Sequence, residues 1–247
     1  ILNHAGFVDS RMWDEQWTEL AKQYRVIRYD MVGYGKSPVV KAPRTRRNDL
    51  KALMDQLKVE RVHLVGCSLG GEIVLDFELE HPDRVISLTL VSAVPGGFEM
   101  QGEPPAELME MMGAVQQGDL QRVSELQVRL WVDGPLRQPE QVKPQVRELA
   151  AMMNKIAVEN GTFAVIDAEP LNPLNPPAAG RIHEVKVPTL IIAGALDNSE
   201  IVRAAAVMAA EIKDAQQVIL PDAAHVPNME QPEIFNQAVL NFLRDIK

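Results

Sequence analysis

The stretch Val65-Gly66-Cys67-Ser68-Leu69-Gly70-Gly71 decides the fold of this chain. Strand-forming residues precede it at 61–65, and a pattern typical of a helix follows it at 72–79. Its centre reads Gly-x-Ser-x-Gly, which is typical of a sharp strand-to-helix turn that exposes a serine hydroxyl. Glycines are expected around that serine because side chains there would collide with the neighbouring strand and helix. The local pattern therefore makes Ser68 a candidate nucleophile.

Strand and helix patterns alternate outward from this turn. Strands are predicted at 1–3, 25–29, 62–65, 85–91, 189–193 and 217–220, and helices at 10–20, 48–57, 72–79, 199–212 and 232–246. The run Leu190-Ile191-Ile192-Ala193 is apolar throughout, as expected for a strand that is buried on both faces. This alternation predicts an α/β fold with a mostly parallel sheet flanked by helices.

Residues 95–180 interrupt the alternation. Helices are predicted there at 106–115, 120–131 and 142–158, and prolines and glycines lie at both ends of the segment. The segment is rich in methionine, and methionines at helical spacing suit either an adaptable core or a lid over an apolar pocket. We expect a helical insertion at 95–180, within a core that is formed by residues 1–94 and 181–247.

Composition excludes several classes of partner. The 247 residues contain no apolar run near the roughly 20 residues that span a membrane. A net charge of -9 with scattered basic residues argues against nucleic acid as a partner. Cys67 is the single cysteine, so an intrachain disulfide is excluded, and we expect this side chain to pack against the sheet. A single cysteine is compatible with a reducing compartment, and the expected location is cytoplasmic.

Two further residues lie at the ends of predicted strands, where Ser68 also lies. Asp197 follows the strand at 189–193, and His225 follows the strand at 217–220. The carboxyl ends of parallel strands meet at one edge of a sheet, and sites form there. A serine needs a nearby base to become a nucleophile, and that histidine needs a carboxylate to orient it. The chain order serine, aspartate, histidine is the order expected for this type of turn.

Other candidates for the base and the acid fit less well. His63 falls within a strand, His81 precedes a proline that ends a helix, and His183 lies on the approach to a strand. His4 lies at the correct edge of the sheet but is expected to shape its own loop. Asp222 belongs to the same loop as His225 and is expected to shape that loop.

The oxyanion of the reaction needs preorganised N–H donors. One is expected from Leu69, the residue after the nucleophile. The second is expected from the loop after the first strand, at Gly6 or Phe7, and the sequence leaves both open. Trp131 and Met152 are candidate residues of the substrate pocket.

Several motifs together resemble the α/β-hydrolase superfamily. Its nucleophile turn is similar to Gly66-Cys67-Ser68-Leu69-Gly70, and its D-x-x-G-x-G-x-S loop is similar to residues 30–37. Its acid and histidine segments are similar to residues 194–197 and 224–225. Residues 3–6 and 11–14 resemble the 3-oxoadipate enol-lactonase group. The resemblance implies a helical cap at 95–180 and two further N-terminal strands, which are missing from this sequence.

The expected function is that of a serine hydrolase for small carboxylic esters or lactones, acting through a Ser-His-Asp triad and an acyl-enzyme. The substrate is a small carbonyl compound, and no metal or organic cofactor is needed. The first alternative keeps the triad for carbon–carbon bond hydrolysis or a perhydrolase activity. Arg129, Arg137 and Arg147 could then bind an acidic substrate, although each could also be a solvated surface residue. A second alternative is a non-catalytic receptor that binds a small ligand.

Overall fold

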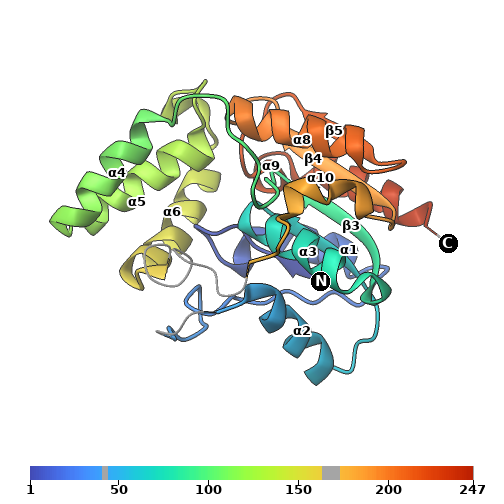
Figure 1. Cartoon of the computed structure of the whole chain (residues 1–247). Coiled ribbons are helices and arrows are strands. Elements are labelled where there is room, and N and C mark those ends of the chain that lie inside the picture. Colours follow the sequence, from blue (N-terminus) through green and yellow to red (C-terminus); the bar gives the residue numbers. More distant parts are fainter. Residues whose placement is uncertain (41–43, 163–172, 247) are drawn as a thin grey trace.

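A five-stranded parallel sheet forms the centre of the computed structural model, which describes residues 1–40, 44–162 and 173–246 (Figure 1). The strands follow one another across the sheet in chain order: β1 (Leu2–Asn3), β2 (Val62–Cys67), β3 (Val85–Val91), β4 (Thr189–Gly194) and β5 (Gln216–Leu220). Every neighbouring pair is parallel. The predicted α/β fold is therefore confirmed.

Helices cover both faces of the sheet. One face packs against α2 (Arg46–Gln56), α3 (Leu69–Glu80) and α8 (Ser199–Glu211), and the other packs against α1 (Asp14–Leu20) and α10 (Pro232–Arg244). Successive strand residues point to opposite faces, so Leu64 joins the first layer and Val65 joins the second. Both layers exclude water from the middle of the sheet, which explains why β4 is buried along its whole length, whereas β5 at the edge of the described sheet is largely exposed.

The segment between β3 and β4 contains the helices that we call the cap helices. They are α4 (Ala106–Gln117), α5 (Leu120–Val128), the π-helical turn η3 (Arg129–Asp133), the short η4 (Pro139–Gln141) and α6 (Pro144–Glu159). Figure 1 shows α4, α5 and α6 side by side at one end of the sheet, in green to yellow. Met111, Leu126 and Val158 give them a small core of their own. Ala150 and Met153 of α6 belong instead to the apolar layer of α1 and α10, so the cap helices are anchored to the core.

Short helical turns connect the larger elements. They are η1 (Ser10–Trp13), η2 (Pro82–Arg84), η5 (Ala178–Gly180), η6 (Ile182–Glu184) and α9 (Pro227–Glu230). Within the described residues, no helix is long and apolar enough to cross a membrane.

Three elements differ from the sequence predictions. The helix predicted at 10–20 begins as the 3₁₀ turn η1 and becomes α-helical only from Asp14. The segment 25–29 is not a strand in the described sheet: it makes a single bridge from Arg28 to Leu2, and the Leu2 N–H donates to the Ile27 carbonyl at 2.8 Å. With only two residues, β1 offers too few partners for a longer ladder. The α-helix predicted at 120–131 ends at Val128 and continues as the π-helical η3, a change of pitch that hydrophobic spacing does not reveal.

Candidate active site

Ser68 lies on the tight turn between β2 and α3. Its φ of 53° and ψ of −119° are unusual for a residue with a side chain. Three hydrogen bonds hold this conformation: the Ser68 N–H donates to the Val91 carbonyl at 2.8 Å, and the Ser68 carbonyl accepts from Gly71 and Glu72 at 2.8 and 3.0 Å. The backbone strain is therefore fixed by the end of β3 and by the first turn of α3.

The two glycines of the motif allow a close approach that no other residue permits. A Cβ on Gly66 would lie 2.2 Å from the Gly70 carbonyl oxygen. A Cβ on Gly70 would lie 2.5 Å from the carbonyl oxygen of Asn3. The start of α3 is thus packed directly on the end of β1, which brings the loop after β1 next to Ser68.

His225 and Asp197 meet at the same edge of the sheet, beyond β5 and β4. The Asp197 Oδ2 atom lies 2.8 Å from the His225 Nδ1 atom, and both side chains are buried. The other carboxylate oxygen of Asp197 accepts from the Asn198 N–H at 2.7 Å. A carboxylate on Nδ1 favours the tautomer with the proton on that atom, which leaves Nε2 as an acceptor. Nε2 is buried and has no hydrogen-bond partner among the described residues.

Ser68 and His225 both line a cavity of about 320 Å³. The core of the fold contributes Gly6, Phe7, Ser68, Leu69, Glu72, Ser92, Val94, Ile201 and His225 to its lining. The cap helices and the loop before them contribute Met100, Leu108, Met111, Gln127 and Trp131. The cavity therefore lies between the sheet edge and the cap helices, with a lining that is mainly apolar.

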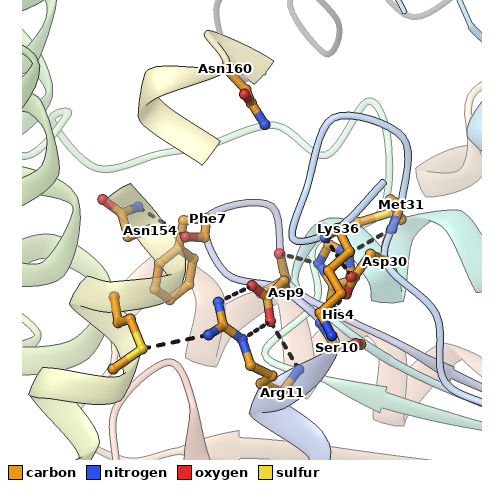
Figure 2. Close-up of polar contacts among 12 residues, drawn as sticks. His4, Phe7, Asp9, Ser10, Arg11, Asp30, Met31, Lys36, Asn154 and Asn160 are labelled. Atoms are coloured by element: carbon orange, nitrogen blue, oxygen red, sulfur yellow. Dashed lines mark hydrogen bonds and ion pairs between the residues drawn. The ribbon is translucent and has the colours of Figure 1, made fainter. Parts of the chain in front are cut away.

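The loop at Gly6 and Phe7 has both of its carbonyl groups fixed. The Tyr34 hydroxyl donates to the Gly6 carbonyl at 2.8 Å. The Asn154 amide of α6 donates to the Phe7 carbonyl at 2.9 Å (Figure 2). In a trans peptide the N–H points opposite to the carbonyl, so the Phe7 N–H points away from Tyr34. Neither the Gly6 N–H nor the Phe7 N–H has a partner within the described part of the chain.

His4 and Asp30 hold this loop and its neighbours in place through hydrogen bonds to backbone groups. His4 is buried, its Nδ1 donates to the Ala5 carbonyl at 2.8 Å, and its Nε2 accepts from the Met31 N–H at 2.9 Å (Figure 2). Burial lowers the pKa of His4, in keeping with a neutral ring that both donates and accepts. Asp30 accepts from the N–H groups of Ser10 and Lys36 at 3.0 and 2.8 Å. His4 thus shapes its own loop, as predicted.

Other residues that the sequence analysis set aside lie away from the cavity. The His63 Nδ1 atom on β2 lies 2.8 Å from the Ser87 hydroxyl on the neighbouring strand β3. His183 and Asp222 are exposed. Cys67 is fully buried, and burial raises the pKa of its thiol. Its Sγ donates to the His225 carbonyl at 3.6 Å, so this side chain packs under the site.

Of the two pocket residues predicted from sequence, one lines the cavity. The Trp131 ring centroid lies 4.6 Å from that of His225. Met152 is 57% exposed and does not line this cavity, and its sulfur accepts from the Arg11 guanidinium at 3.5 Å. Neighbouring helix positions point in different directions, and on α6 it is Met153 that points inward.

The three arginines considered for an acidic substrate are all engaged elsewhere. Arg147 binds the buried Asp133 carboxylate through two hydrogen bonds of 2.6 and 2.9 Å. Arg137 pairs with Glu230 at 2.6 Å, and both are buried. Arg129 donates to the carbonyls of Gly134 and Arg137. None of the three lines the cavity, and a solvated surface role is wrong for Arg137.

Three polar residues of the cavity, Glu72, Ser92 and Gln127, were not predicted from the sequence. Glu72 lies one helical turn after Ser68, a spacing that places two residues on the same side of a helix. Ser92 directly follows β3 and has a positive φ of 45°, so it lies at the same sheet edge as the other site residues. Helical spacing could have identified Glu72, and its position directly after a strand could have identified Ser92. Gln127 could not, because it depends on how α5 packs.

Comparisons with known proteins agree with this architecture. A family model described as alpha/beta hydrolase fold matches residues 1–232. The chain is 30% identical over 226 residues to the 2-hydroxy-6-oxononadienedioate/2-hydroxy-6-oxononatrienedioate hydrolase of Escherichia coli K12, covering 89% of the chain and 76% of that relative. It is 27% identical over 250 residues to 3-oxoadipate enol-lactonase 1 of Acinetobacter baylyi, covering 100% and 89%. A crystal structure of a hydrolase from Pseudomonas aeruginosa PA01 superposes with a TM-score of 0.78 at 30% identity, covering 98% of this chain and 88% of that chain.

Proposed function

This chain belongs to the alpha/beta hydrolase fold family and is a hydrolase, and we propose that it cleaves small carboxylic esters or lactones through Ser68, His225 and Asp197. One observation carries the proposal. The His225 Nδ1 atom is held by Asp197 at 2.8 Å, and its buried Nε2 atom has no partner within the described residues, in the cavity that also contains Ser68. A buried acceptor of this kind is what a serine hydroxyl needs in order to lose its proton.

In the proposed mechanism, the Ser68 oxygen attacks the substrate carbonyl carbon while His225 Nε2 takes the hydroxyl proton. Asp197 stabilises the imidazolium that forms. The carbonyl π bond opens to an oxyanion, which collapses as the leaving oxygen departs with the proton from His225. Water then attacks the acyl-enzyme with His225 again as the base, releasing the acid and restoring Ser68.

Two backbone N–H groups are proposed to bind the oxyanion. One is the N–H of Leu69, the first residue of α3, where the helix end leaves the N–H without a helical partner. The other is the N–H of Phe7 rather than that of Gly6, because the hydrogen bond from Tyr34 to the Gly6 carbonyl turns the Phe7 N–H away from Tyr34. Each such donor contributes roughly 10²–10³ in rate. In the same proposal, residues 95–180 act as a cap on the core of 1–94 and 181–247, with Trp131 above His225.

The test is hydrolysis of p-nitrophenyl butyrate by the wild type, by Ser68→Ala and by Ser124→Ala. Ser124 is a matched control because it lies on α5 and does not line the cavity. We expect Ser68→Ala to lose turnover and Ser124→Ala to keep it. A phosphonate inhibitor should add one adduct mass to the wild type, which peptide mapping places on Ser68. Equal turnover by Ser68→Ala and the wild type would contradict the proposal.

Carbon–carbon bond hydrolysis is the second candidate, because the 30% identical relative from Escherichia coli is named for an oxo-dioate hydrolase. The same triad would serve that reaction. Turnover of a neutral vinylogous diketone at a higher kcat/KM than the butyrate ester would favour it. The non-catalytic receptor alternative is set aside because the relatives are named as enzymes.

A further inference from the structure

Gln127 of α5 is a buried amide at the cavity that Ser68 and His225 line. Its side chain is only 5% exposed and forms part of the cavity lining. It lies one helical turn before Trp131, which lines the same cavity and whose ring centroid lies 4.6 Å from that of His225. No step of the proposed mechanism uses the Gln127 amide, so its role has to be sought elsewhere in the reaction.

The orientation of the Gln127 amide follows from a backbone carbonyl. The Phe7 carbonyl can only accept a hydrogen bond, so the Asn154 atom that lies 2.9 Å from it is the amide nitrogen, Nδ2 (Figure 2). The same nitrogen lies 2.6 Å from the Gln127 amide, so the Gln127 atom that meets it is the acceptor, Oε1. Exchanging oxygen and nitrogen in either side chain would place two acceptors or two donors against each other.

The Oε1 atom of Gln127 is therefore engaged, and Nε2 is the end of the amide that remains. Nε2 has no hydrogen-bond partner within the part of the chain that the structure describes. A buried amide nitrogen without an acceptor costs free energy, and buried polar groups of proteins nearly always have a partner. Because Gln127 lines the cavity, a molecule bound there can supply the acceptor.

The Ser92 hydroxyl is a second polar group of this cavity. It is buried, lines the cavity and makes no hydrogen bond to the described residues. A hydroxyl can donate as well as accept, whereas the Gln127 nitrogen can only donate. A carbonyl oxygen accepts from either group and brings no donor of its own that would need a partner. The two side chains therefore suit a substrate that carries a second carbonyl group.

We propose that Gln127 is a specificity-determining residue, whose Nε2 atom donates to a keto oxygen of the substrate that lies apart from the carbonyl attacked by Ser68. The inference rests on the proposed ester hydrolysis at Ser68. Asn154 then holds both the Phe7 peptide and the specificity group, since its one nitrogen donates to each. A buried donor discriminates against a substrate without an acceptor more strongly than an apolar wall discriminates by shape.

The test compares p-nitrophenyl esters of keto acids with those of the matching alkenes, in which a methylene group replaces the keto oxygen. The pairs are 4-oxopentanoate with 4-methylenepentanoate, 5-oxohexanoate with 5-methylenehexanoate, and 6-oxoheptanoate with 6-methyleneheptanoate. Each kcat/KM is divided by the rate constant for hydrolysis of the same ester by hydroxide, which removes differences in intrinsic reactivity. For the wild type, we expect the keto ester to exceed its alkene by about five-fold or more in at least one pair.

Gln127→Met keeps the length of the side chain but removes the donor, so the ratio of keto ester to alkene ester should fall to about one. Gln121→Met is the matched control: it makes the same substitution at an exposed position of α5 outside the cavity lining, and should keep the wild-type ratio. A ratio within one preparation does not depend on the fraction of folded enzyme. A wild type without a preference in any pair, or a ratio that survives Gln127→Met, would overturn the inference.

A failure of the ester hydrolysis itself gives a different result, because no ester would then be turned over faster than by Ser68→Ala. In that case, Ser68→Ala with and without Gln127→Met is titrated with the methyl esters of the same pairs. Tryptophan fluorescence follows binding, since Trp131 lines the cavity. Tighter binding of a keto ester than of its alkene by Ser68→Ala alone supports the inference, and a preference in both proteins or in neither overturns it.

Discussion

Arg137 and Glu230 form a buried ion pair between the cap helices and the loop that carries His225. The Arg137 Nη1 atom donates to Glu230 Oε2 at 2.6 Å, while Glu230 Oε1 accepts from the Ala224 N–H at 2.7 Å. Arg137 also donates to the carbonyls of Val132 and Asp133 at the end of η3. Glu230 thus connects the residue before His225 to the turn that carries Trp131, so the position of the proposed base depends on the cap helices.

Breaking this pair should cost both stability and activity. Arg137→Leu leaves the buried Glu230 carboxylate without its cation, and we expect a loss of roughly 3–5 kcal/mol in the free energy of unfolding. Adding Glu230→Gln to it removes the buried charge and keeps an oxygen for the Ala224 N–H, so much of the stability should return. Urea denaturation of the wild type, both single variants and the double variant measures the coupling. Strictly additive changes would show that the two side chains do not act together.

Asn154 should act through the oxyanion loop. Its amide donates to the Phe7 carbonyl and to Gln127 Oε1, so Asn154→Ala frees the peptide whose neighbouring N–H is proposed to bind the oxyanion. We expect kcat to fall roughly ten-fold or more with little change in KM, because the displaced donor acts mainly in the transition state.

The control for this change is Asn160→Ala. Asn160 directly follows α6 as its C-cap, but its amide donates to the Gly33 carbonyl at 2.8 Å, away from Phe7 (Figure 2). Its kcat for p-nitrophenyl butyrate should stay close to that of the wild type. Equal losses of kcat in the two variants would mean that the position of α6, and not the Phe7 peptide, is what matters.

The choice of acid can be tested at two aspartates. Asp197→Asn keeps the size of the side chain but no longer stabilises the imidazolium, and kcat should fall by about 10³–10⁴. Asp222→Asn changes an exposed residue of the His225 loop and should leave kcat within about two-fold, as is usual for surface positions. Steady-state kinetics of the two variants with one ester decides between them, and a larger loss at Asp222 would reverse the assignment.

The parts of the site that could be predicted from sequence are those set by one strand end each. Ser68, Asp197 and His225 each follow a predicted strand. Because parallel strands end at one edge of a sheet, their proximity can be predicted without knowing how the side chains pack. Asn154 and Phe7 are separated by 147 positions, and Arg137 and Glu230 by 93. Their pairing follows from how the cap helices rest on the core, which no local pattern encodes.

A similar limit applies to the fold. The strands from β2 to β5 follow from apolar runs, but the segment at 25–29 has the same pattern and forms only one bridge. A strand needs partners as well as propensity, and these depend on what lies beside it. The charge of the cavity is another case: the sequence contains several arginines near Trp131, and only their ion pairs show that they are turned away from the cavity.

Asp76 on α3 should make stability depend on pH. Burial raises the pKa of its carboxyl to about 6, although Arg47 opposes the shift, and one carboxyl oxygen is buried without a hydrogen-bond partner within the described residues. Because the folded-state pKa lies above the unfolded value, the folded state binds the proton more tightly. Its contribution to stability is therefore present below about pH 4 and is lost as the pH rises through about 6.

Asp76→Asn removes the charge that burial disfavours, so above pH 7 it should be more stable than the wild type by on the order of 2 kcal/mol. The gain should shrink as the pH is lowered from 7 to 4.5, because the wild-type carboxyl then takes up its proton. Urea denaturation of both proteins across this range measures the difference, with Asp222→Asn as a control that has an exposed carboxyl. A gain that is the same at every pH would show that packing of the amide, and not titration of Asp76, is responsible. A variant that is less stable at pH 8 would mean that the attraction between the Asp76 charge and the Arg47 charge outweighs burial.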